Sequence, residues 1–377
     1  MILTIIIFLV LLSILVLAHE WGHFITARKF GVGAEEFGLG FPPRLFGWYR
    51  NMAGKGVFFF GNKEITDAKN TVYSFNLFPI GGFVKIKGEN GEDKTDASSF
   101  GSKSISKRII ILSAGVMMNI VLAAVIIIVG LGLGLPQALD ETALPAGAKI
   151  SNRQIQIMMV GTGSPAEQAG LKPGDAIASI NNQTFSDYSE VQDFVADKAG
   201  QKLNYVIKRG SETFTKEITP QLMSETKKAG IGISIAETGI VRYPWYKAIV
   251  EGIKLTGLLI WAIIVGLATV IAKLFSGQSV SAEVAGPIGI ATLTGQMADL
   301  GFAYVAQFAA LLSLNLAVIN FIPFPALDGG RILFLIIEKI KGSPIKQKTE
   351  AIIHNFGFLI LIALIVLVTF KDIIKLF

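Results

Sequence analysis

Residues 2–23 read ILTIIIFLVLLSILVLA-HEWGH, an uncharged apolar run from Ile2 to Ala18 followed directly by His19-Glu20-Trp21-Gly22-His23. The run is just long enough to cross a bilayer core of about 30 Å with help from its flanks. A cleaved signal peptide is the alternative, but it needs a basic start and a small-residue cleavage site, and neither is visible before His19. We therefore expect a retained membrane helix with polar residues at its far end.

The composition is that of a membrane protein. Of 377 residues, 51% are hydrophobic and 16% charged, and the mean hydropathy is +0.56, so part of the surface must face lipid. There is no cysteine, so any metal ligands must be His, Asp or Glu. The net charge of +6 lacks basic runs with interleaved aromatics, which excludes nucleic acid as a partner. It instead fits basic cytoplasmic loops.

Later parts of the chain alternate between apolar and polar stretches. Four further apolar segments are Ile109–Leu135, Leu255–Leu274, Phe302–Phe324 and Phe356–Phe370. Ala27–Arg108 lies between the N-terminal apolar run and Ile109–Leu135 and is basic and glycine-rich. Short strands are expected in it at Gly56–Phe60 and Gly82–Lys87. Ala138–Glu237 is polar and alternates like β structure, which predicts a separate domain of about 100 residues.

The H-E-x-x-H pattern at His19–His23 predicts a zinc site. On a helix, residues four apart share one face, so both imidazoles can reach a single cation. Glu20 between them can take a proton from water and later return it to a leaving amine. The alternative is a helix end with two ordinary histidines. Three ionisable groups at a membrane boundary are costly, however, and usually mark function.

A catalytic zinc takes three protein ligands, so a third must come from elsewhere. His354 is one candidate, but it stands alone in a polar connection. Asp328 is the stronger one, because it is the sole acidic residue between Asp299 and Glu338 in an apolar stretch broken by Pro323 and Pro325. The alternative for Asp328 is a cap on a helix that starts near Arg331.

Taken together, these motifs resemble the site-2 protease family of intramembrane zinc metalloproteases, in its bacterial regulator-of-sigma-E protease type. The resemblance runs nearly end to end. H-E-x-x-H is joined by N-x-x-P-x-P-x-L-D-G-G at 320–330, and by G-H-F-x-x-A-R-x-x-G-V, P-x-G-G-[YF]-V-K, G-x-x-x-N and G-P-I motifs at 22–32, 79–85, 115–119 and 286–288.

The resemblance implies roles for individual residues. It assigns one Zn²⁺ per chain to His19, His23 and Asp328, with Glu20 as the base. It assigns substrate contacts to Asn315, Asn320, Gly81, Gly82 and Phe83. The implied substrates are membrane segments of single-span proteins, such as anti-sigma factors and signal-peptide remnants, cut in regulated intramembrane proteolysis.

The polar middle domain resembles a PDZ module. Gly163–Asp175 followed by Ala176–Asn181 matches the turn, helix and strand of bacterial PDZ domains. Such a domain can add a peptide strand, and so bind a peptide terminus, at a sheet edge. It can equally bind nothing and only exclude bulky substrates, and both readings remain open. One such repeat is present, where the sigma-E regulator type has two.

Charge and coordination together predict the membrane topology. Arg28 and Lys29 follow the H-E-x-x-H motif, which places that end of the helix in the cytoplasm and the PDZ-like domain outside. Asp328 must reach the depth of the histidines, so Phe302–Phe324 must run inward and Leu255–Leu274 should lie in the interface without crossing. The prediction is a multi-pass protein of the cell (inner or plasma) membrane, in contact with the lipid bilayer.

The expected fold is a polytopic α-helical membrane protein with four transmembrane helices, a membrane-associated β element and an inserted α+β PDZ-like domain. Its expected parts are a first transmembrane helix (1–26), a cytoplasmic-side loop with the β element (27–104), a second transmembrane helix (105–135), the PDZ-like domain (138–238), an interfacial or re-entrant region (244–300), a third transmembrane helix with the L-D-G-G motif (301–340), and a cytoplasmic loop with the fourth transmembrane helix (341–377).

Two other functions are compatible with parts of this sequence. A membrane-anchored zinc protease acting on cytosolic or interfacial substrates would take its third ligand from a polar helix outside the lipid. A non-enzymatic PDZ adaptor would have no need of Glu20 between the two histidines, so that residue argues against it.

Overall fold

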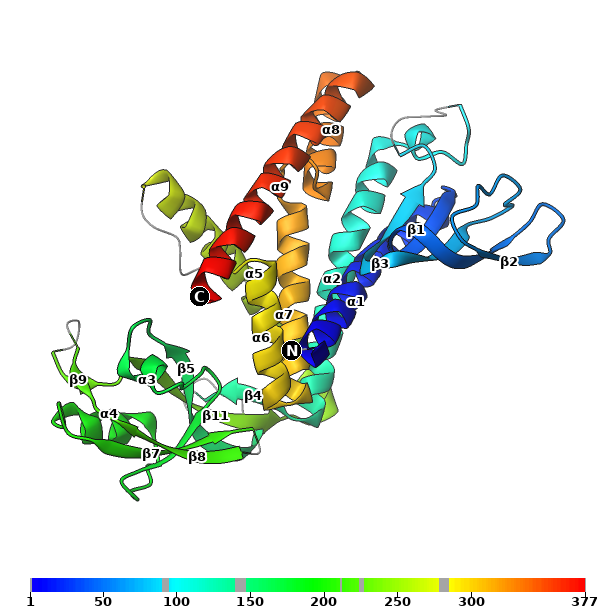
Figure 1. The fold of residues 1–377 in the computed structure, drawn as a ribbon. Coiled ribbons are helices and arrows are strands. Elements are labelled where there is room, and N and C mark those ends of the chain that lie inside the picture. The colour runs from blue at the N-terminus through cyan, green and yellow to red at the C-terminus, as the bar shows by residue number, and fades with distance from the viewer. Residues whose placement is uncertain are drawn as a thin grey trace. The chain divides into compact units, whose positions relative to one another are not determined.

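The computed structural model describes residues 2–89, 95–139, 147–210, 212–223, 227–277 and 285–376. The chain divides into two compact units. We name Met1–Val125, Lys254–Gly295 and Ala309–Phe377 the helical unit. Ile126–Ile253 and Gln296–Phe308 form the PDZ-like unit. Some long helices pass from one unit into the other (Figure 1).

Five of the described helices are long and apolar enough to cross a membrane. These are α1 (Ile2–Lys29), α2 (Ile105–Leu133), α5 (Trp245–Phe275), α7 (Phe302–Phe321) and α9 (Gln347–Leu376). Shorter helices are the one-turn η1 (Phe100–Ser102), α6 (Pro287–Leu300) and α8 (Asp328–Lys341). By length and composition, α5 is therefore a fifth candidate beside the four expected spans. These two properties alone do not support a count of four.

Glycine lets α1 and α2 lie in close contact. A Cβ atom on Gly22 would stand 2.2 Å from the carbonyl oxygen of Ala114, and one on Gly115 would stand 2.3 Å from Nε2 of His23. Small residues at such crossings allow backbones to approach closely in lipid, where burial of apolar surface supplies no drive for helix association. The crossing lies at the level of the H-E-x-x-H turn.

Contacts at the two ends of the helical unit define the directions of its helices. Near the start of α1, Thr4 lies against Gly295 of α6, the helix that leads toward α7. Near the end of α9, Asp372 accepts a hydrogen bond of 2.8 Å from the amide of Gly289, also in α6. Near the start of α9, Gly357 lies against Pro325, which follows α7. Helices α1 and α7 therefore run the same way, and α9 runs back.

The region 301–340, expected to hold the third transmembrane helix and the L-D-G-G motif, contains two helices. Helix α7 ends at Phe321 and α8 begins at Asp328. Pro323 and Pro325 lack the amide hydrogens that a continuous helix would use, which accounts for the break. The chain that connects α7 to α8 turns tightly. A Cβ atom on Gly329 would stand 2.2 Å from the carbonyl oxygen of Ile322, and one on Gly330 would stand 2.2 Å from that of Phe324.

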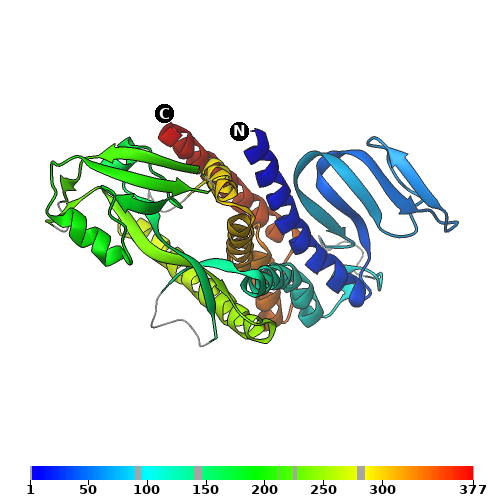
Figure 2. The same cartoon turned by 90° about the horizontal axis from the view of Figure 1, so that it is seen from below.

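The β element is a three-stranded antiparallel sheet in the order β2-β1-β3. Its strands are β1 (Ala34–Arg50), β2 (Gly56–Phe60) and β3 (Val72–Ile86). The sheet lies on one side of α1, and α2 lies on the other (Figure 2). Cβ positions on Gly81 and Gly82 fall 3.2 and 3.1 Å from side-chain atoms of Val16 and Leu17. The two glycines therefore let β3 lie directly on α1.

A buried acid stabilises the bend of this sheet. Glu36 accepts hydrogen bonds from Arg44, at 2.8 and 2.5 Å, and from the Ser74 hydroxyl at 2.6 Å. Burial by itself raises the pKa of the Glu36 carboxyl, but these donors together bring the pKa below its ordinary value. The carboxylate therefore stays ionised and joins the beginning of β1 to its middle.

The PDZ-like unit contains a six-stranded antiparallel sheet in the order β4-β11-β5-β6-β7-β8, with a small β10-β9 sheet beside it. Its strands are β4 (Leu135–Ala138), β5 (Lys149–Val160), β6 (Ala176–Ile180), β7 (Leu203–Arg209), β8 (Glu212–Ile218), β9 (Gln221–Leu222), β10 (Ala229–Gly230) and β11 (Ile233–Arg242). Helices α3 (Pro165–Gln168) and α4 (Tyr188–Ala196) complete it. Its own core contains Ile157, Ile180, Ile207 and Tyr205, all buried.

Candidate metal centre

Two buried histidines and a half-buried aspartate meet where α1, α2 and α8 come together. His19 and His23 lie one turn apart on α1, with their Nε2 atoms 3.2 Å from each other. Oδ2 of Asp328 stands 3.0 Å from Nε2 of His19 and 3.3 Å from Nε2 of His23. Among the described residues, these three form the one group of His, Asp or Glu side chains close enough together to hold a metal ion.

The chemistry of this cluster fits a cation. Each imidazole Nε2 and the Asp328 oxygen can present a lone pair, and three such atoms at about 3 Å repel one another unless a positive charge lies among them. Ligands about 2 Å from a tetrahedral zinc are themselves roughly 3.3 Å apart. The observed separations of 3.0–3.3 Å therefore suit a zinc ion with these three ligands.

The turn before α8 places Asp328. Leu327 is the N-cap of α8 and makes no side-chain capping bond, so Asp328 is the first helical residue and not the cap that was one alternative for it. Ala326 has a φ of 75°, which is unusual for a residue with a side chain. Its amide donates a hydrogen bond of 2.9 Å to Nδ1 of His354. The structure thus places His354 against the turn and away from the cluster.

Two main-chain groups that the sequence did not reveal orient the H-E-x-x-H side chains. Nδ1 of His23 lies 2.8 Å from the carbonyl oxygen of Ile111 on α2, so this nitrogen carries the proton and donates it. The amide of Val84 on β3 donates to Oε2 of Glu20 at 2.9 Å. Neither contact leaves a side-chain signal in the sequence, because any residue supplies the same main-chain groups.

The residues expected to contact substrate have local roles in this structure. Nδ2 of Asn315 donates to the Leu311 carbonyl of its own helix at 2.9 Å. Asn320 is half-buried one residue before the end of α7. Phe83 stacks with Phe41, with ring centres 6.4 Å apart. Gly81 and Gly82 pack on α1. Contacts between these five residues and a substrate stay predictions.

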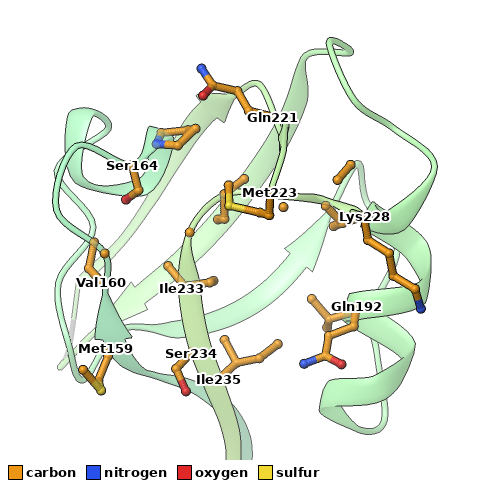
Figure 3. Close-up of a pocket in the computed structure, with 18 of the residues that line it drawn as sticks. Met159, Val160, Ser164, Gln192, Gln221, Met223, Lys228, Ile233, Ser234 and Ile235 are labelled. Atoms are coloured by element: carbon orange, nitrogen blue, oxygen red, sulfur yellow. The ribbon is translucent and has the colours of Figure 1, made fainter. Parts of the chain in front are cut away.

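The PDZ-like unit carries a separate cavity of 780 Å³ between β11 and α4 (Figure 3). The apolar part of its lining includes Ile233 on β11, Val191 on α4, and Met223. From Ile233 to Ala236, β11 pairs with β5 on one side, whereas β4 pairs only with the later residues from Thr238 to Val241. The first half of β11 therefore has an edge that is not paired with β4.

Two buried histidines and a half-buried aspartate with an adjacent glutamate, set among apolar helices, define a zinc metalloprotease of the membrane. The sequence matches Peptidase family M50 over residues 7–364, so the chain belongs to this family, the site-2 proteases. It is a zinc metalloendopeptidase and a multi-pass membrane protein.

Named relatives match along nearly the whole chain. The regulator of sigma-W protease RasP of Bacillus subtilis (strain 168) is 29% identical over 99% of each chain. The zinc metalloprotease RasP of Oceanobacillus iheyensis has the same identity and coverage. A solved PDZ domain of an SdrC-like protein from Listeria innocua is 25% identical over 22% of this chain and 92% of that one, with a TM-score of 0.21.

Proposed function

We propose that this protein cleaves single-span membrane proteins within their membrane segments. The carrying observation is the depth of the cluster within the helices. His19 and His23 directly follow the uncharged apolar run of α1, a candidate span, and they are buried against α2, another candidate span. A peptide bond that reaches these side chains must leave its own helix and enter the apolar region of the enzyme.

The residues divide the chemistry among them. Zinc, when held by His19, His23 and Asp328, would polarise the scissile carbonyl and lower the pKa of water. Glu20 takes the proton of the attacking water and delivers it to the leaving amine. The Val84 amide keeps one oxygen of Glu20 in place, which leaves the other oxygen to handle the proton.

A substrate helix must unwind before it is cut, because its amides are hydrogen-bonded within the helix. The unwound segment needs new partners for its main chain, since unpaired amides and carbonyls cost several kcal/mol in lipid. Strands of the β element lie directly beside α1, where an added strand would find such partners. Anti-sigma factors and signal-peptide remnants are substrates of the required single-span kind.

We further propose that four helices cross the bilayer: α1, α2, α7 and α9. Arg28 and Lys29 end α1, which favours a cytoplasmic end for it. The shared direction of α1 and α7 brings Asp328 to the same side as the histidines. A crossing by α5 would reverse α7, and a bilayer core of about 30 Å cannot separate ligands of one ion. We place α5 in the interface and the PDZ-like unit outside.

Labelling of single cysteines tests this topology, since the chain has none of its own. Cysteines near Gly277 and within Ser186–Ser189 should react with an impermeant reagent from outside. A cysteine near Lys346 should react from the cytoplasmic side alone. Reaction near Gly277 from the cytoplasm would make α5 a span, and the four-crossing arrangement would then fail.

The groove of the PDZ-like unit would take an extended peptide terminus with an apolar last residue. Its lining is mainly apolar, and Lys228 is the one charged side chain among the described lining residues. The β11 edge from Ile233 to Ala236 suits strand addition. A peptide trimmed outside the membrane would present such a terminus. The competing role, exclusion of bulky substrates, needs no occupant.

Mapping the cut tests the principal proposal. The purified protein is reconstituted in lipid with a single-span substrate, and the products are identified by mass spectrometry. We expect cleavage within the membrane segment, bound zinc in both wild type and Glu20→Gln, and a loss of rate of at least about 10²-fold in that variant. Cuts confined to loops outside the lipid would favour an interfacial protease instead. Appreciable cleavage by Glu20→Gln would remove Glu20 from the role of base.

A further inference from the structure

An imidazole that binds a metal through Nε2 carries its proton on Nδ1, and that N–H needs an acceptor. His23 meets this requirement, because its Nδ1 lies 2.8 Å from the Ile111 carbonyl oxygen. His19 offers Nε2 to the same cluster, so its Nδ1 must also donate. Among the described residues, no carbonyl oxygen accepts a hydrogen bond from this nitrogen.

The group beside Nδ1 of His19 is the side-chain amide of Asn119 on α2. Its Nδ2 atom stands 3.5 Å from Nδ1, at the long end for a hydrogen bond. Asn119 is fully buried, and its Oδ1 atom has no hydrogen-bond partner among the described residues. An NH₂ group facing a protonated Nδ1 would set two donors against each other. In the same amide, an acceptor is left unused.

A turn of 180° about the last side-chain bond exchanges the oxygen and nitrogen of an amide. We infer that Asn119 orients His19 for metal binding by accepting a hydrogen bond from its Nδ1 through Oδ1. Asn119 is then a positioning residue, because it acts on the metal through His19. This inference rests on the proposed ligation by His19.

A second buried hydrogen bond reaches Asn119 at its main chain, away from the side-chain amide. The hydroxyl of Ser313 on α7 donates to the main-chain carbonyl of Asn119 at 2.8 Å, and Ser313 is itself buried. Gly115, one turn earlier on α2, leaves the space in which both imidazoles sit. Gly115 and Asn119 are four residues apart, so they lie on the same face of α2. Gly115 leaves space for His23 there, and Asn119 places an acceptor beside His19.

A purely structural role makes a different prediction. If Asn119 only fills space between helices, leucine of similar size should be tolerated at least as well as aspartate, because a carboxylate is costly to bury unless it is paired. If it accepts from His19, aspartate retains the acceptor and leucine removes it. Whether Asn119→Asp or Asn119→Leu binds zinc more tightly therefore distinguishes the orienting role from the space-filling role.

The experiment measures zinc affinity by chelator competition on the full-length protein in lipid, for wild type, Asn119→Asp, Asn119→Leu and Ser313→Ala. Loss of a hydrogen-bond partner behind a metal ligand typically weakens binding by about 10–100-fold. We expect that loss in Asn119→Leu, affinity near that of wild type in Asn119→Asp, and no loss in Ser313→Ala. Ser313→Ala is the matched control, because it removes a buried hydrogen bond at the same residue without touching the amide.

A second readout needs no comparison of affinities. The chain has only three histidines, so ¹⁵N-histidine labelling gives a spectrum that can be assigned by substitution. The Nδ1–H signal of His19 should change in zinc-loaded Asn119→Leu, while that of His23 stays in place. Unchanged His19 signals, or Asn119→Leu affinity equal to wild type, would overturn the inference.

The His19→Ala variant separates this failure from a failure of the proposed ligation. If His19→Ala keeps zinc at full affinity, His19 is not a ligand and the proposed function itself needs revision. If His19→Ala loses zinc while Asn119→Leu keeps it, the error lies with Asn119 alone.

Discussion

The metal centre and the groove of the PDZ-like unit are built in different ways. At the metal centre, helices touch through glycine, and ring nitrogens and carboxylate oxygens stand about 3 Å apart. In the groove, a strand edge and apolar side chains surround a cavity of 780 Å³. Bond breaking needs groups held to within a fraction of an ångström, because misplacement costs rate steeply. Recognition by strand addition uses main-chain groups, so it tolerates many sequences.

Removal of a metal ligand should have the largest effect in this comparison. His19→Ala, His23→Ala and Asp328→Ala each leave two of three protein ligands, so we expect loss of stoichiometric zinc and of cleavage. Metal content after purification, measured by atomic absorption, checks this. Full zinc binding by Asp328→Ala would send the search for the third ligand elsewhere, with His354 first in line.

Added volume at the helix crossing should have the next largest effect. In Gly115→Ala the new methyl group would stand 2.3 Å from Nε2 of His23 and 2.8 Å from Cε1 of His19. Overpacking of this kind costs about 1–3 kcal/mol, and here it also displaces the two imidazoles. We expect a lower melting temperature and weaker zinc binding.

Gly257→Ala on α5 is the control for that substitution, because no described atom beyond the adjacent backbone of its own helix lies within 4 Å of its added Cβ. It should leave zinc affinity unchanged and stabilise α5 slightly, since glycine is the poorer helix former. Equal zinc affinity in Gly115→Ala and wild type would show that the close packing at α2 is not needed for the site.

Deletion of Ala138–Glu237 should have the smallest effect on chemistry. Thr238 pairs with Ala138, so a short glycine-serine linker joins two neighbouring strand ends. We expect continued cleavage of a short, already trimmed substrate and new cleavage of substrates with large outer domains. Loss of cleavage of the short substrate would point to a role in folding or in substrate docking.

A groove-filling variant sharpens the same prediction. Gln192→Trp adds bulk at an exposed position in the groove lining and leaves the unit's core untouched. If the unit selects substrates by binding their ends, this variant should slow cleavage of those substrates. If the unit only excludes bulk, the cleavage pattern should match that of wild type.

Sequence patterns were most informative where chemistry needs particular side chains at a particular spacing. H-E-x-x-H places both histidines on one face only if it is helical. Asp328 was identified because placing an acidic side chain in an apolar stretch costs free energy. The structure brings these residues together. The strand at Gly56–Phe60 was also predicted with its observed bounds, whereas the short strand expected at Gly82–Lys87 is the last part of the longer β3. The break at Pro323 and Pro325 was expected, and the structure has α7 before it and α8 after it.

By itself, the sequence determined the family, the zinc chemistry and the residues able to perform it, because side-chain type and helical periodicity are local properties. Only the tertiary structure decided which partners orient them. The Ile111 carbonyl, the Val84 amide and the Asn119 side chain lie far along the chain from the histidines and the glutamate that they meet. Main-chain groups are the same at every residue, and an asparagine becomes an orienting group only when packing buries it beside an imidazole. Those contacts follow from the close crossing of α1 with α2 and β3, which glycine permits.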